Sequence, residues 1–159
     1  MPPVEIAPNV FWIGVNDHHT DLFESMWPIQ DTGVSYNTYL IRDEKNAVID
    51  LSKEMMTEPF LEQLKSVIDP ADLDYIIVNH MEPDHTGALS AVRELAPDAE
   101  ILGTSLAASF LENFYGIEEG FRPVKHGEPL SLGSHTLQCA QTPNVHWPET
   151  MMTYLQENR

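Results

Sequence analysis

Residues 80–85 (HMEPDH) place four potential metal ligands within six positions, shortly after the apolar run 75–78 in the sequence. A short β-branched run of this kind is typical of a buried strand. Pro83 disfavours both a continued strand and an immediate helix, so the ligands are expected on a tight loop at the carboxyl end of that strand. Because ligands bind at this edge in open α/β sheets, the segment favours an α/β fold with a site at the strand end.

The ligand types in this segment limit the metals that it suits. Two imidazoles and two carboxylates offer nitrogen and oxygen without a thiolate, a set that fits iron, manganese or zinc. Alternate residues of an extended segment project the same way, so we expect His80, Glu82 and Asp84 to converge. His85 should approach from the side, and a helix should begin at about Ala88. Any one of these residues alone would be read as part of an ordinary solvated loop.

The pattern His-x-Glu-x-Asp-His resembles the metal signature of the flavodiiron proteins. They are a branch of the metallo-β-lactamase superfamily, whose hydrolytic members more usually carry His-x-His-x-Asp-His. Glu82 is the residue that separates the two patterns. A carboxylate in place of the second imidazole adds negative charge and a harder donor, which favours a pair of iron ions over a hydrolytic zinc pair. The resemblance implies a metallo-β-lactamase-like αβ/βα sandwich.

A second segment, residues 144–151 (NVHWPETM), resembles the next ligand segment of the same family, in which a His before Trp-Pro binds the first iron. An isolated His-Trp-Pro could equally contain a packed core histidine. Its occurrence together with the first motif makes His146 a predicted ligand. The resemblance implies two iron ions, one with His80, Glu82 and His146 and the other with Asp84 and His85.

The polar segment 17–24 lies between the opening strands. In many relatives a histidine that supports the metal ligands follows the Phe of this segment, whereas Glu24 stands at that position here. His18 and His19 could be substitutes, but a solvated loop is the preferred interpretation for both.

The remaining patterns give a coarse element order. Helical periodicity predicts helices at 57–67 and 88–95, and a third that is capped by Thr104 and Ser105 and ends near 115. Strands are expected at 9–15, 33–41, 47–50, 100–102, 121–124, 129–132, 135–140 and 150–155. This order corresponds to the first half of the sandwich and the start of the second, with the last strand at an unprotected edge.

The resemblance covers essentially the whole chain and also indicates what residues 1–159 lack. The family continues with a bridging Asp and a further His, but no Asp or His follows His146 here. The flavodoxin-like domain that carries FMN is also absent. We therefore expect residues 1–159 to be the amino-terminal portion of a diiron domain whose remaining half and flavodoxin-like domain are supplied in cis or by a second chain. Homo-oligomerisation is also expected, because the sheet edge is open.

Charge and cysteine content restrict the partners and the compartment. The formal net charge is −17, from 8 basic and 25 acidic residues, so neither nucleic acid nor an anionic membrane surface is expected as a partner. No apolar run approaches membrane-spanning length. The single Cys139 cannot form an internal disulfide and is expected to be a buried structural thiol, which makes the cytoplasm the simplest compartment.

Three functional interpretations remain. The preferred one is part of a flavodiiron oxidoreductase that reduces dioxygen to water, nitric oxide to nitrous oxide, or both, with electrons from a rubredoxin-like or deazaflavin donor. The second is a dinuclear metallohydrolase in which Asp84 orients a metal-bound hydroxide that attacks an ester, thioester or phosphodiester. The third is a catalytically silent metal-binding fragment, which is the state expected for the isolated chain.

Overall fold

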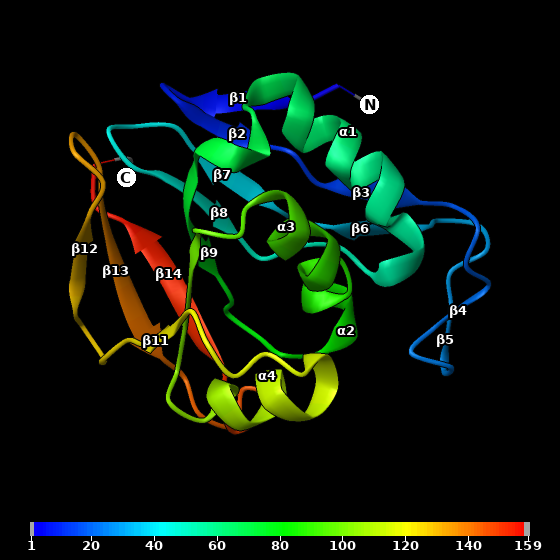
Figure 1. The fold of residues 1–159 in the computed structure, drawn as a ribbon. Coiled ribbons are helices and arrows are strands. Elements are labelled where there is room, and N and C mark those ends of the chain that lie inside the picture. The colour runs from blue at the N-terminus through cyan, green and yellow to red at the C-terminus, as the bar shows by residue number, and fades with distance from the viewer. Residues whose placement is uncertain (1, 158–159) are drawn as a thin grey trace.

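The computed structural model describes residues 2–157 and is built on a seven-stranded mixed sheet (Figure 1). Its strand order is β1-β2-β7-β8-β9-β10-β11; the first four are antiparallel neighbours, and β8 to β11 run parallel. The strands span Val4–Ala7 (β1), Val10–Trp12 (β2), Tyr39–Ile41 (β7), Asn46–Ile49 (β8), Leu73–Ile77 (β9), Glu100–Gly103 (β10) and Phe121–Pro123 (β11).

A second, three-stranded antiparallel sheet consists of β12 (Pro129–Ser131), β13 (Thr136–Gln141) and β14 (Met151–Leu155). Strand β14 lies at its edge, as the sequence predicts. Two short ribbons pair β3 (Val15–Asp17) with β6 (Val34–Tyr36) and β4 (Leu22–Phe23) with β5 (Trp27–Pro28). The β4–β5 hairpin projects from the body of the molecule (Figure 1).

Residues 2–157 contain four α-helices, of which the sequence predicted all but the second. They are α1 (Thr57–Val67), α2 (Pro83–Thr86), α3 (Leu89–Leu95) and α4 (Ala107–Tyr115), with 3-10 turns at Glu54–Met56 and Pro70–Asp72. The bounds of α1 agree with the sequence prediction, and α4 ends at Gly116 in the left-handed conformation (φ 64°), which a glycine adopts without steric cost. Among residues 2–157, none of the helices has both the length and the apolar character needed to cross a membrane.

Two local predictions were wrong. Pro83 begins helix α2 immediately, because the first position of a helix needs no N–H donor and its φ suits the proline ring. Thr104 does not cap α4, whose N-cap residue is Leu106 and which has no side-chain cap. Instead the Thr104 hydroxyl donates to the main-chain oxygen of Glu149 at 2.8 Å, a tertiary partner that no local pattern reveals.

Alternating residues of the central strands divide the core between the two faces of the large sheet. Ile76 of β9 faces the side covered by helices, where it belongs to the same cluster as Phe60 of α1. Its neighbour Ile77 faces the three-stranded sheet, where it clusters with Leu137 and Cys139 of β13. Cys139 is buried as predicted, and burial raises the pKa of its thiol. The result is a layered α/β sandwich in which the carboxyl end of β9 opens beside the β13–β14 connection.

Candidate metal centre

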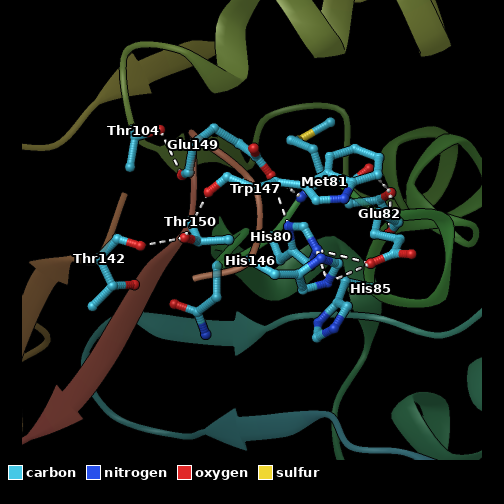
Figure 2. Close-up of polar contacts among 12 residues, drawn as sticks. His80, Met81, Glu82, His85, Thr104, Thr142, His146, Trp147, Glu149 and Thr150 are labelled. Carbon is cyan, nitrogen blue, oxygen red and sulfur yellow. Dashed lines mark hydrogen bonds and ion pairs between the residues drawn. The ribbon is translucent and has the colours of Figure 1, made fainter. Parts of the chain in front are cut away.

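Two loops that are far apart in the sequence meet at the carboxyl end of β9 (Figure 2). The first leads from β9 into α2 and carries His80 and Glu82. The second connects β13 to β14 and carries His146. They are brought together because β9 and β14 belong to two sheets that pack face to face, and the Met151 N–H donates to the carbonyl oxygen of Asn79 at 2.9 Å.

Three ligand atoms converge where these loops meet. Glu82 Oε2 lies 3.0 Å from His80 Nε2 and 2.9 Å from His146 Nε2, and the two Nε2 atoms are 3.2 Å apart. Ligands that bind one ion at about 2.1 Å in adjacent octahedral positions are about 3 Å apart. The three atoms therefore have the spacing of one triangular face of an octahedron.

The chemistry of this triad fits a bound cation. Carboxylate oxygens and unprotonated imidazole nitrogens are all acceptors, so their lone pairs repel at these distances unless a positive charge lies between them. Two imidazoles and one carboxylate on a single face, with the remaining positions open, are typical of non-haem ferrous iron. The His146 side chain is 68% exposed, against 8% for His80 and 15% for Glu82, so the open positions face outward.

Asp84 and His85 lie beside this triad and form a separate pair. Because α2 turns the chain after Glu82, Asp84 does not converge with His80 and Glu82; its Oδ2 lies 3.6 Å from His85 Nε2 instead. Asp84 Oδ1 is buried without a hydrogen-bond partner, and burial together with the nearby Glu82 carboxylate raises the pKa of Asp84 despite the opposing effect of His85. The rings of His80 and His85 are 5.2 Å apart.

Two further carboxylates contact the Nδ1 atoms of His80 and His85. Sequence analysis did not select either of them as functional. Asp50, directly after β8, has its Oδ2 3.2 Å from His85 Nδ1 and accepts the Asn79 N–H through Oδ1 at 2.7 Å. Burial lowers the pKa of His85, but the contact with Asp50 outweighs this effect and the net pKa is raised. Glu149 Oε1 lies 2.7 Å from His80 Nδ1. In the sequence, Asp50 is marked only as the last residue of a predicted strand, and Glu149 only as a member of the predicted ligand segment 144–151.

The triad and the pair share a cavity of about 520 Å³, closed on one side by the β4–β5 hairpin. Phe23, Glu24 and Trp27 of this hairpin segment line the cavity. The Glu24 carboxylate forms an ion pair with the Lys53 ammonium at 3.2 Å, and this contact connects the hairpin to the loop before α1. His18 and His19 are exposed, in agreement with the solvated-loop interpretation.

A sequence profile described as "ODP family beta lactamase" matches residues 34–159, most of the chain and every candidate ligand. The chain belongs to this family. Among curated relatives of this ODP-family chain, a protein named nitric oxide reductase from Moorella thermoacetica is 39% identical over 156 residues, which are 98% of this chain and 39% of the relative. A flavo-diiron protein, FprA2, from Clostridium acetobutylicum is 36% identical and is covered to 40% of its length.

Solved structures give the same result for this member of the ODP family. A flavoprotein from Thermotoga maritima superimposes with a TM-score of 0.91 at 36% identity, over 98% of this chain and 40% of that one. Rubredoxin oxygen:oxidoreductase from Desulfovibrio gigas gives 0.90 at 33% identity, over 96% and 38%. The resemblance and the metallo-β-lactamase-like fold are thereby confirmed, and the chain spans about two fifths of the length of these relatives.

Proposed function

We propose that this chain is part of a flavodiiron oxidoreductase that reduces dioxygen to water, nitric oxide to nitrous oxide, or both. The observation that carries the proposal is the position of Glu82 Oε2 between the Nε2 atoms of His80 and His146. A hard carboxylate donor in this place suits redox-active iron better than a hydrolytic zinc pair. Relatives named for nitric oxide reduction and for rubredoxin:oxygen oxidoreduction support the same reaction class.

Under this proposal the chain supplies three ligands to one iron ion and two ligands to the second. His80, Glu82 and His146 bind the first, while Asp84 and His85 form one side of the site for the second. When bound, two ferrous ions supply binding positions and electrons for a diatomic gas. His80 and Glu82 are nearly buried and fix the inner side of the site, whereas His146 borders the cavity through which a small gas molecule enters.

The relatives are about two and a half times as long as this chain, and we propose that the other groups needed for the reaction lie in the part of the protein that corresponds to their remaining three fifths. We assign to that part the bridging carboxylate, the last imidazole and a flavodoxin-like domain with FMN, either in cis or on a second chain. Residues 1–159 are then the amino-terminal portion of the diiron domain. A rubredoxin-like or deazaflavin donor supplies electrons, the assembly is a homo-oligomer, and the reaction takes place in the cytoplasm.

The test uses the complete protein, loaded anaerobically with ferrous iron and reduced by a photoreduced deazaflavin. Consumption of dioxygen or nitric oxide is measured with gas electrodes. We expect Glu82→Gln to lower the rate at least tenfold, because it removes the charged ligand, and Glu94→Gln, an exposed position on α3, to leave it unchanged. Consumption of neither gas by the iron-loaded protein, or chelator-sensitive ester hydrolysis by a zinc-loaded form, would contradict the proposal and favour a hydrolase.

A further inference from the structure

Glu149 is a buried carboxylate that the metal centre as described above does not use. It is 2% exposed and lies on the β13–β14 connection, three residues after His146. Its Oε1 atom accepts the main-chain N–H of Met81 at 3.0 Å and lies 2.7 Å from His80 Nδ1 (Figure 2). Glu149 therefore contacts the Nδ1 side of the His80 ring, while Glu82 and His146 contact its Nε2 side.

This contact determines which nitrogen of His80 carries hydrogen. A carboxylate oxygen that already accepts a main-chain N–H remains an acceptor toward the imidazole, so Nδ1 must be the donor. In a neutral imidazole the lone pair is then on Nε2, the atom that faces the other two candidate ligands. We propose that Glu149 is the positioning residue that fixes His80 as an Nε2 ligand and orients its ring; this inference rests on the proposed metal site.

The carboxylate is held rigidly enough for this role. Thr104, at the end of β10, donates its hydroxyl to the Glu149 carbonyl oxygen at 2.8 Å. The next residue, Thr150, donates to the Trp147 carbonyl oxygen at 3.0 Å, and the Trp147 ring packs edge-on against His80 with centroids 5.0 Å apart. Threonine hydroxyls therefore hold the main chain that carries Glu149, and an aromatic ring packs against the imidazole.

The charge of Glu149 is complementary to a metal ion on the far side of His80. Among residues 2–157, its only ion-pair partner is the His80 ring, and its Oε2 atom is buried without a hydrogen-bond partner. No lysine or arginine in the described part of the chain forms an ion pair with the carboxylate. Donation from His80 Nδ1 to this negative group strengthens Nε2 as an electron-pair donor to a metal, and a divalent cation bound there in turn compensates the buried charge.

The test uses zinc as a diamagnetic probe on the purified 159-residue chain with ¹⁵N-labelled histidine. Zinc affinity is measured by chelator competition, and long-range ¹H–¹⁵N spectra identify the ligating nitrogen and the Nδ1–H of His80. In the unmodified chain we expect zinc on Nε2 and an Nδ1–H protected from solvent exchange. Glu149→Leu should lower the zinc affinity 10- to 100-fold and abolish the protection of the His80 Nδ1–H from solvent exchange, because the acceptor is lost.

Three further variants separate positioning from simple support of the fold. Glu149→Gln retains an acceptor oxygen for Nδ1 and should restore the protected Nδ1–H, with affinity within about threefold of the unmodified chain. Glu149→Asp keeps a carboxylate but withdraws it by about 1.5 Å, so it should lose the protection while folding normally. Glu112→Leu, at an exposed position of α4, is the control and should change neither readout.

The inference is overturned if Glu149→Leu or, should that variant fail to fold, Glu149→Asp binds zinc with unchanged affinity and with the same protected Nδ1–H. Loss of the Nδ1–H signal in Glu149→Gln would overturn it as well, because the acceptor is then not what matters. Gas reduction plays no part in these measurements. A failure of the proposed function and a failure of this inference are therefore distinguishable.

Discussion

At the scale of single residues, the character of the site depends on one carboxylate, Glu82. Its Oε2 is within 3.0 Å of both His80 Nε2 and His146 Nε2, so its charge acts directly on whatever ion these nitrogens bind. Nitrogen donors bind zinc more tightly than ferrous iron. A carboxylate is a harder ligand, so it reduces the difference between the two affinities. The identity of this one side chain should therefore set the preference of the site between the two metals.

We predict that Glu82→His shifts the preference of the chain toward zinc. The ratio of ferrous iron affinity to zinc affinity should fall by about tenfold or more, because a third imidazole replaces the carboxylate. Competition between the two metals under anaerobic conditions, followed by metal analysis of the protein, measures this ratio. Glu94→His, on the exposed side of α3, is the control. An unchanged ratio in Glu82→His would show that the carboxylate does not select the metal.

At the scale of elements, the two sheets are connected by Asp43 in the β7–β8 turn and the β12–β13 turn opposite it. Asp43 Oδ2 accepts the His135 main-chain N–H at 2.7 Å and lies 2.8 Å from His135 Nδ1, while Oδ1 accepts the Ser134 N–H at 3.1 Å. Burial would raise the pKa of Asp43, but these hydrogen bonds outweigh it and hold the pKa well below the usual value. The contact stabilises the ionised carboxylate.

This contact predicts a defined dependence of stability on pH. Because the pKa of Asp43 is lower in the folded than in the unfolded chain, its contribution is complete above about pH 4 and is lost as the pH falls through the folded pKa. Asp43→Asn should lower the free energy of unfolding at pH 7 by about 1.5–3 kcal/mol, the usual value for hydrogen bonds to a charged group. It should also flatten the acid decline below pH 4. Urea unfolding at several pH values tests both statements.

Gly133 in the β12–β13 turn is predicted to be essential to the same junction. Its φ is 126°, and a Cβ atom there would lie 2.6 Å from Asp43 Oδ1. Gly116 after α4 also has positive φ, at 64°, but a Cβ there would meet no atom within 4 Å. For Gly116→Ala we expect the free energy of unfolding to fall by roughly 1 kcal/mol, from backbone strain alone. Gly133→Ala should lower it clearly more, because the new methyl group would also meet Asp43. Equal losses in thermal unfolding would contradict the steric explanation.

At the scale of the whole molecule, apolar surface remains open between the two sheets. A cavity of about 610 Å³ is bordered by Ile6 and Ile41 of the large sheet and Leu155 of β14. On the β14 edge strand itself, Met152 and Tyr154 are 56% and 48% exposed. Unpaired edge strands with exposed apolar side chains promote association between chains.

We accordingly predict that the 159-residue chain self-associates in a concentration-dependent manner. Tyr154→Lys should reduce this association, because a charge on an edge strand opposes strand pairing between molecules. Light scattering coupled to size-exclusion chromatography measures the effect, and Glu94→Gln serves as a control that changes the net charge by the same amount away from the edge. A monomeric unmodified chain at high micromolar concentration would contradict the prediction.

The metal stoichiometry also belongs to this scale. We expect the isolated chain to bind one ferrous ion tightly and a second at least tenfold more weakly, because only the triad converges while Asp84 and His85 provide two ligands for the neighbouring position. Native mass spectrometry after anaerobic loading counts the ions per chain. His146→Ala should remove the tight site. Two equally tight ions in the monomeric chain would contradict the unequal sites.

The sequence by itself determined the local features of this protein. Apolar periodicity placed α1 within its observed bounds, the β-branched run located β9, and the spacing of residues 80–85 together with His146 indicated the candidate ligands and the family. These signals are local because helix and strand periods, turn residues and motifs all act over a few neighbouring positions. Nothing in them required knowledge of the packing.

Only the tertiary structure decided how the side chains of these candidate ligands are supported. The pairing of Glu149 with His80 spans 69 residues, and that of Asp50 with His85 spans 35. Thr104 donates to Glu149 instead of capping α4, because packing of the two sheets places an acceptor within its reach. Contacts of this kind depend on how β9, β13 and β14 meet in space. Local sequence patterns carry no information on that geometry, whereas the packed sheets determine it.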